Sequence, residues 1–221
     1  MNTACMATFP ARREQLQNTV ESLLPQVDQL RIYLNEYSSV PDFLVHDKIA
    51  VEIDGPDLGD AGKVANLPDE GFTFLVDDDI IYPPDYVKVL TSAIETYGRE
   101  AVVGCHAAVV MPPVRNYFND RRVYHFNSYV AKHTAVNVLG TGCLAYHTDY
   151  VDFDLSDAPC SNMLDVHFAV WCQTHRKRMR TVARPGGWLE SQKVPTSLWA
   201  TRGAGETQTY YINTVEKWTV F

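Results

Sequence analysis

Short apolar runs typical of strands alternate with segments of helical periodicity through the first half of the chain. Strands are expected over Thr3–Thr8, Gln29–Asn35, Ile49–Ile53, Phe72–Val76 and Ala101–Cys105. Apolar residues recur at helical spacing in Arg12–Leu24, and Pro84 opens a second helical segment that ends at Tyr97, just before a glycine. This alternation predicts an α/β fold with a mostly parallel central sheet flanked by helices. Ligands of such sheets bind beyond the carboxyl ends of the strands.

The second half of the chain is less regular. A strand is expected over Gly140–His147, a helix over Met163–His175 and a further strand over Met179–Ala183. The aromatic and polar segment Arg122–Asn137 fits either a hairpin or a loop with a short helix. From about Ser191 apolar periodicity is lost, and we expect a loop to the end of the chain. No linker is evident, so the 221 residues predict one domain.

Charge and cysteine usage exclude several classes of protein. The formal net charge of −8 disfavours general binding to nucleic acid. No stretch is long and apolar enough to span a bilayer, and the first residues lack the basic region of a signal peptide, so we expect a cytoplasmic protein. The five cysteines include no CxxC pair, which favours reduced and mostly buried thiols.

Three consecutive aspartates, Asp77, Asp78 and Asp79, follow the apolar run Phe72–Val76 directly. Adjacent carboxylates at the end of a buried strand repel one another and need a compensating cation. Mg²⁺ and Mn²⁺ prefer carboxylate oxygen, and residues i and i+2 of an extended segment face the same side. Asp77 and Asp79 are therefore candidates to address one ligand together. The alternative is a solvated acidic turn before a helix.

The segment Phe74–Tyr86 resembles the DxD segment of GT-A glycosyltransferases, especially those of the family 2 type. Four other segments resemble further parts of the family, in the family's order. Thr8–Arg12 resembles the nucleotide-binding turn, and Gly59–Lys63 resembles the D-x-G-K segment. Gly140–Tyr146 resembles the acceptor-side glycine strand, and Leu164–Asp165 resembles the catalytic acidic position. The resemblance extends over about Thr3–Leu189. It implies one Rossmann-like GT-A domain over 1–221, with a nucleotide-binding half at about 1–100, an acceptor-binding half at about 101–190 and a C-terminal loop at about 191–221.

The resemblance implies a donor site around the aspartates. Asp77 would contact the ribose, Asp79 would bind Mn²⁺ or Mg²⁺ on the diphosphate, and Asp78 would share one of these tasks or orient its neighbours. The rest of the nucleotide pocket would consist of Thr8, Pro10, Arg12 and Lys63. Asn35 stands where the family often has an aspartate that contacts the base, and its amide can hydrogen-bond a uracil edge. Outside this resemblance, the arginine fits a solvated helix start and the lysine a surface loop.

On the acceptor side, the resemblance makes Asp165 the general base that takes the proton of the attacking hydroxyl. Leu164 stands where the family commonly has a glutamate, and a first-turn helix aspartate is the alternative interpretation. Gly142 would let the backbone approach a substrate closely. Trp188 would stack on an acceptor sugar, or else pack partly in the core.

The function implied by the resemblance is metal-dependent transfer of a sugar, with inversion, from a nucleotide diphosphate donor to a hydroxyl. A UDP-sugar is the favoured donor, and the acceptor is a saccharide, a lipid-linked glycan or a protein. Such an enzyme would act in glycan or surface polysaccharide synthesis, in the cytoplasm or peripherally at a membrane. A nucleotidyltransferase-like enzyme ranks second, because the turn Thr8–Arg13 lacks a glycine-rich phosphate loop. A non-catalytic module that binds sugar nucleotides or carbohydrate is the third interpretation.

Overall fold

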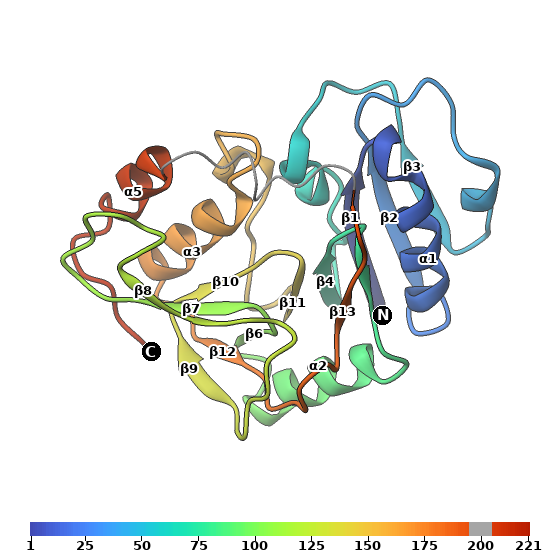
Figure 1. Cartoon of the computed structure of the whole chain (residues 1–221). Coiled ribbons are helices and arrows are strands. Elements are labelled where there is room, and N and C mark those ends of the chain that lie inside the picture. Colours follow the sequence, from blue (N-terminus) through green and yellow to red (C-terminus); the bar gives the residue numbers. More distant parts are fainter. Residues whose placement is uncertain (195–204) are drawn as a thin grey trace.

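The computed structural model describes residues 1–194 and 205–221 and has a mixed α/β architecture (Figure 1). The strands of its main sheet are β1 (Asn2–Thr8), β2 (Gln29–Leu34), β3 (Ile49–Glu52), β4 (Phe72–Val76), β6 (Val102–Gly104), β9 (Thr134–Val136), β11 (Cys143–His147) and β12 (Met179–Thr181). Within the described residues these eight strands lie in the order β3-β2-β1-β4-β11-β6-β12-β9. The predicted large α/β sheet is therefore confirmed.

The strand directions bring several strand ends to one edge of this sheet. Strands β3, β2, β1 and β4 are mutually parallel, and β6 is parallel to β12. Strand β11 runs antiparallel between β4 and β6, and β9 runs antiparallel to β12, which the apolar pattern does not predict. Because Cys143 pairs with Val76, the start of β11 lies beside the end of β4. The residues before β11 therefore meet the aspartates after β4.

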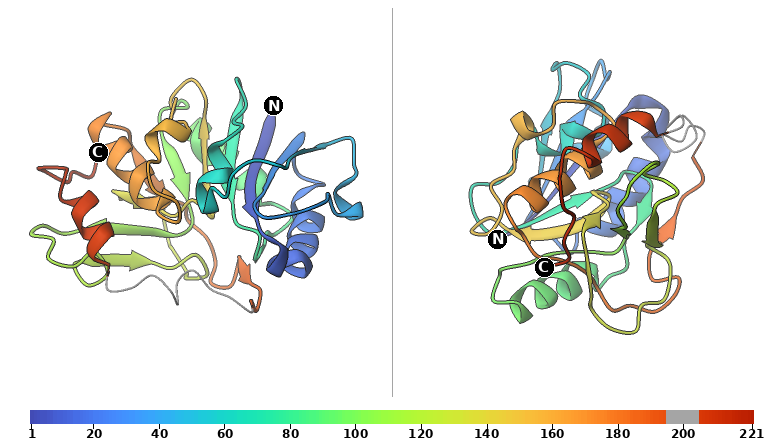
Figure 2. Two further views of the ribbon diagram at one scale, coloured as in Figure 1. Left: turned by 90° about the horizontal axis from the view of Figure 1, so that it is seen from above. Right: turned by 90° about the vertical axis from the view of Figure 1, so that its left-hand side faces the viewer.

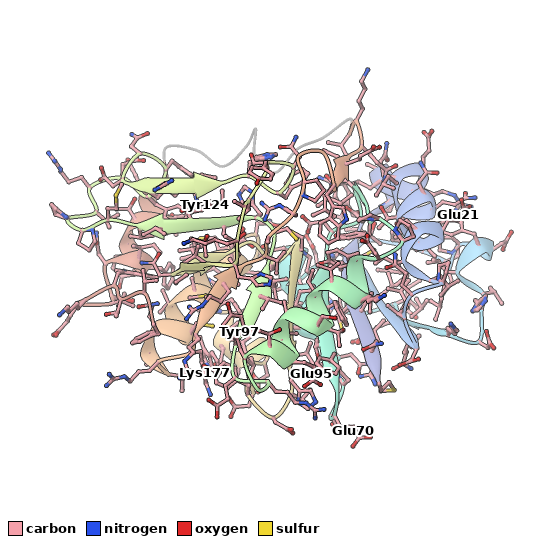
Figure 3. The ribbon with its side chains drawn as sticks, turned by 90° about the horizontal axis from the view of Figure 1, so that it is seen from below. Glu21, Glu70, Glu95, Tyr97, Tyr124 and Lys177 are labelled. Carbon is pink, nitrogen blue, oxygen red and sulfur yellow. The ribbon has the colours of Figure 1, made fainter. Side chains whose placement is uncertain are left out.

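Helices cover both faces of the main sheet. The α-helices are α1 (Arg13–Leu23), α2 (Tyr86–Thr96), α3 (Leu164–Thr174) and α5 (Glu206–Ile212), and the 3₁₀ helices are η1 (Pro10–Arg12), η2 (Asp42–Leu44), η3 (Gly59–Val64) and η4 (Leu155–Asp157). Strand β1 sends Ala4 and Met6 into a core with α1 and α2, and Cys5 into a second core with α3. This alternation follows from the two-residue period of a strand. Glu21 on α1 and Glu95 on α2 are exposed to solvent on these two helices (Figure 3).

Among the residues that the structure describes, two small sheets accompany the main one. One has the order β10-β7-β8, from Val138–Leu139, Ala107–Val110 and Arg121–Tyr124, and the other pairs β5 (Ile80–Ile81) with β13 (Glu190–Ser191). The segment 122–137 is thus neither of the two forms left open by the sequence. Its beginning belongs to β8, which pairs with β7, and its end contains β9 of the main sheet.

The expected loop after Ser191 is wrong in two places. Ser191 itself pairs in β13, and Glu206–Ile212 forms α5, which lies beside α3 (Figure 2). Ile212 and Trp218 are buried against α3, and the Trp218 indole nitrogen donates to the Ile212 carbonyl at 2.9 Å. So few core-facing residues leave no detectable period in the sequence. The loop predicted over 195–204 lies outside the described residues.

All five cysteines are free thiols, and four of them are buried, as expected. In the described part of the chain, none of the helices is long and apolar enough to cross a membrane. A groove of about 680 Å³ between α1 and α2 reaches Asn2 at the amino end of β1, and Glu21, Gln26 and Lys88 contribute to its lining. It therefore lies away from the edge where the aspartates meet the start of β11.

Candidate active site

The aspartates after β4 point in different directions. The Asp78 side chain is 6% exposed, whereas the side chains of Asp77 and Asp79 are 39% and 20% exposed. Tyr82 fixes the start of this turn: it accepts a hydrogen bond from the Asp77 backbone nitrogen at 2.9 Å, and its hydroxyl donates to the Gly142 carbonyl at 2.5 Å. The first and third carboxylates are thus accessible, and the second is buried.

Residues at the end of β1 hold the buried carboxylate. Thr8 donates a hydrogen bond to Asp78 Oδ2 at 2.7 Å. Arg12, at the end of a 3₁₀ turn that begins with the exposed residue Pro10, contacts Asp78 Oδ1 at 2.8 Å and Asp79 Oδ2 at 2.6 Å. Burial opposes the charge of Arg12, but the aspartates outweigh it and the pKa of the guanidinium is raised. Arg12 is therefore a fixed cation in this site, not a solvated helix start.

Lys63 is the second cation of the site. It is only 5% exposed, its ammonium forms an ion pair with Asp77, and it also approaches the Thr141 carbonyl at 3.4 Å. Burial alone would lower the pKa of Lys63, but the negative charges of Asp77 and Asp60 outweigh this effect, so the pKa is raised. The surface-loop interpretation of this lysine is therefore wrong.

Asp165 approaches the same place from α3. It lies in the first turn of that helix, but the N-cap residue is Met163 and the carboxylate does not cap the helix. Instead, Asp165 Oδ1 accepts hydrogen bonds from the Thr141 backbone nitrogen at 2.6 Å and from the Thr141 hydroxyl at 2.7 Å. The segment that precedes β11 thus connects this carboxylate to the aspartates after β4.

Gly142 is where that segment touches the aspartates. A Cβ atom at this position would lie 2.0 Å from Asp77 Oδ2, so only glycine allows the carboxylate its present place. We expect Gly142→Ala to displace the carboxylate and to destabilise the protein by about 1–3 kcal/mol. The melting temperature checks this prediction, with Gly186→Ala as the control, because a Cβ there meets no atom closer than 3.7 Å. An unchanged melting temperature for Gly142→Ala would contradict the argument.

Negative charge exceeds positive charge in this site. The carboxylates of Asp77, Asp78, Asp79 and Asp165 are joined by Asp60, which accepts a hydrogen bond from the Leu164 backbone nitrogen at 2.9 Å. Arg12 and Lys63 are the cations that face these groups. Burial raises the pKa of Asp60 to about 6, and burial together with Asp77 raises the pKa of Asp79 to about 6. The site is therefore suited to a further cation.

The fit of these residues to a divalent cation rests on the two accessible aspartates. Among the described residues, no three histidine, cysteine or acidic side chains are grouped so that they could hold a metal ion by themselves. The side chains of Asp77 and Asp79 both retain exposed surface. Mg²⁺ is commonly held by one or two carboxylates, with water and substrate phosphates as its other ligands. A metal ion held by these two carboxylates would need its other ligands from water or from a bound molecule.

The raised pKa of Asp79 has a consequence for stability. The pKa of this carboxyl is about 6 in the folded protein and about 3.9 in the unfolded chain, so its ionised form destabilises the fold. The destabilisation is complete above about pH 6 and disappears below about pH 4. We expect Asp79→Asn to raise the stability of the ligand-free protein at pH 7.5 by about 1–2 kcal/mol, and to have little effect at pH 4. Melting temperatures at both pH values check this, with the exposed Asp69→Asn as control. A lower stability of Asp79→Asn at pH 7.5 would contradict it.

Two of the predicted site residues, Asn35 and Trp188, form their contacts outside the cluster of aspartates and cations. Asn35 is 4% exposed, and its amide donates to the Gly59 carbonyl at 3.0 Å and accepts from the Leu58 nitrogen at 2.9 Å, so it holds the loop before η3. Trp188 packs against Tyr86 and donates to Asp85 at 3.0 Å. Trp188 therefore packs partly in the core. A uracil contact at Asn35 would have to replace the hydrogen bonds that its amide forms with the loop.

Three residues that contribute to the site cannot be identified from the sequence pattern. Tyr82 lies in an apolar run and looks like a core residue, yet its hydroxyl joins the turn after β4 to Gly142. Asp60 lies in a loop with several other aspartates, and nothing in the pattern distinguishes it. Thr141 is hidden between two glycines. Each acts through contacts across the sheet, which a local pattern does not record.

Comparison with known proteins adds no relative to this description. None of the known protein-family models matches the chain. A comparison with curated proteins also gives no significant match.

Proposed function

We propose that this protein is a metal-dependent glycosyltransferase with a single GT-A-like domain, which transfers a sugar from a nucleotide diphosphate donor to a hydroxyl acceptor. One observation carries the proposal. The accessible carboxylates of Asp77 and Asp79, the cations Arg12 and Lys63, and the candidate base Asp165 converge at the carboxyl ends of β1 and β4. Ligands of open α/β sheets bind at such an edge.

On the donor side, the carboxylates would bind a metal ion and the two basic side chains would face the phosphates. Asp77 and Asp79 would hold Mn²⁺ or Mg²⁺, which when bound supplies positive charge to the departing diphosphate. Arg12 and Lys63 are fixed and buried, so they offer cations to the phosphates without a loss of side-chain freedom on binding. A UDP-sugar is the donor to test first.

The acceptor half gives Asp165 a defined proton-accepting atom. Both hydrogen bonds from Thr141 go to Oδ1, which leaves Oδ2 to take the proton of the acceptor hydroxyl. As the acceptor oxygen forms its bond to the anomeric carbon, the bond from that carbon to the phosphate oxygen breaks, and the diphosphate leaves with the electron pair. This single displacement inverts the anomeric carbon. The proposed acceptors are a saccharide, a lipid-linked glycan or a protein hydroxyl.

The test is release of nucleoside diphosphate from UDP-, GDP- and dTDP-sugars in the presence of Mn²⁺, with and without a mixture of saccharide acceptors. We expect one nucleotide to be released, and its release to cease when EDTA removes the metal. Asp79→Asn should lose this activity, whereas Asp69→Asn, an exposed carboxylate outside the site, should keep it. Release that is equally fast without metal, or in Asp79→Asn, would contradict the proposal.

A further inference from the structure

His106 packs against Gly140, the residue before the Thr141 that binds Asp165, although the donor site does not use it. It follows Gly104 of β6 by two residues, and its backbone is held on both sides: its nitrogen donates to Cys143 Sγ at 3.1 Å, and its carbonyl accepts from the Gly140 nitrogen at 2.9 Å. A Cβ atom on Gly140 would lie 3.2 Å from the imidazole. The absence of a side chain there gives the ring its room.

The imidazole lacks a hydrogen-bond partner in the described part of the chain. Its Nδ1 atom is buried and unpartnered. Burial lowers the pKa of His106 to about 4, so the ring is neutral near pH 7; Asp165, His125, Arg121 and Asp77 are the titratable groups that act on it. A buried N–H without an acceptor is costly, whereas a buried lone pair costs less. The favoured tautomer therefore carries its proton on Nε2.

An aromatic wall stands next to this ring. The His125 ring lies 5.4 Å from His106 in an edge-on arrangement, and the half-buried Phe126 ring lies 6.2 Å away. His125 and Phe126 lie 4.3 Å apart. Because aromatic faces offer rigid apolar surface, such a wall suits the C–H face of a sugar ring.

Arg184 fixes this wall in place. The side chain is buried, and it donates to the carbonyls of His125 at 2.7 Å, Phe126 at 2.8 Å and Cys105 at 2.6 Å. No carboxylate among the described residues forms an ion pair with it, and burial lowers the pKa of its guanidinium. Because the buried guanidinium binds these backbone carbonyls, the loop that carries His125 and Phe126 is held in one position, which lowers the entropic cost of binding a ligand there.

Three consecutive residues connect this wall to the reacting groups. Gly142 lies against Asp77, Thr141 binds Asp165 and Gly140 lies against His106. The donor-side carboxylate, the candidate base and the imidazole are therefore placed by one short segment, in that order.

We propose that His106 and Phe126 form a binding site for a saccharide acceptor, in which His106 Nε2–H donates to the hydroxyl next to the reacting one and Phe126 packs on the sugar ring. This inference rests on the proposed function. A sugar ring carries several hydroxyls, so it can offer one to Asp165 and another to the imidazole. Phe126 and His106 are here binding residues, and Arg184 is a positioning residue.

The test compares variants of His106 in binding to methyl glycosides. The probes are the methyl glycosides of glucose, galactose, mannose and N-acetylglucosamine, and histidine ring ¹H–¹⁵N spectra report binding. We expect one or more probes to shift the His106 nitrogens, and not those of the distant, exposed His46. His106→Phe, which keeps the ring shape without nitrogen, should bind the probe about tenfold more weakly. His106→Gln, which keeps an N–H near the Nε2 position, should restore much of the affinity.

UDP with Mn²⁺ provides the independent check on the donor site in the same variants. We expect its binding to be equal in wild type, His106→Phe and His106→Gln. If nucleotide binds but no methyl glycoside moves the His106 signals, the acceptor inference is wrong while the proposed function stands. If His106→Phe and wild type bind the glycoside equally, the inference is also wrong. If nucleotide fails to bind but the glycoside binding depends on His106, the saccharide site stands and the donor proposal falls.

Discussion

Lys63→Met is expected to destabilise the protein by about 3–5 kcal/mol at pH 7.5, since it removes one partner of a buried ion pair. Methionine fills a similar volume, so the loss reports charge more than packing. Asp60 and Asp77 would then lose the cation whose charge acts on both. Chemical denaturation measures the free energy of unfolding directly.

The matched control is Lys88→Met, an exposed lysine on α2. Its effect should lie within about 0.5 kcal/mol of zero. The loss from Lys63→Met should shrink in the double variant with Asp77→Asn, because the carboxylate left without a partner is then also removed. Equal losses in the single and double variants would show that Lys63 stabilises the fold by packing and not by its charge.

Asp165→Asn is expected to lower the rate of sugar transfer by about 10²–10⁴-fold, the usual contribution of a general base. The amide retains an oxygen that can accept both Thr141 hydrogen bonds, so the fold and the binding of nucleotide should be preserved. The measurement is the rate of transfer with saturating donor, together with the affinity for UDP and Mn²⁺.

Thr141→Val separates the base from its support. It removes the hydroxyl that binds Asp165 but keeps the backbone nitrogen bond, so we expect a smaller loss of rate than in Asp165→Asn. Unchanged transfer in Asp165→Asn would remove this residue from the mechanism. Loss of both transfer and nucleotide binding would instead assign it to the donor site. A protein that binds nucleotide but transfers no sugar even as wild type would fit a non-catalytic module.

The sequence predicts the first half of the fold well because local patterns decide it. Strand β1 and helix α2 show their apolar periods openly, and both lie where the pattern puts them, to within a few residues at each end. The direction of β11 is different. Its residues have the same strand character whether the chain runs parallel or antiparallel to β4, so only the three-dimensional connection decides. Helix α5 was missed because a single residue of its seven, Ile212, is buried.

The site was predicted in its residues but not in its contacts. The need for a cation beside Asp77 and Asp79 follows from elementary electrostatics, and the metal was the expected source. Part of that charge comes from Arg12 and Lys63, which lie more than ten positions away in the chain. His106 could not have been singled out, since one histidine after a strand carries no pattern. Its significance depends on Gly140 and Asp165 being brought beside it.

The proposed function requires the edge formed by β1 and β4 to bind a nucleoside diphosphate together with a divalent metal ion. The most direct measurement is the melting temperature with UDP, GDP, dTDP, ADP and CDP, each with and without Mn²⁺, in wild type and in Asp79→Asn. A ligand that binds only the folded state must raise that temperature. We expect one nucleotide to raise the melting temperature in the presence of Mn²⁺ only, and we expect Asp79→Asn to lose this rise although the variant is itself more stable. No rise with any nucleotide, or an equal rise in Asp79→Asn, would contradict it.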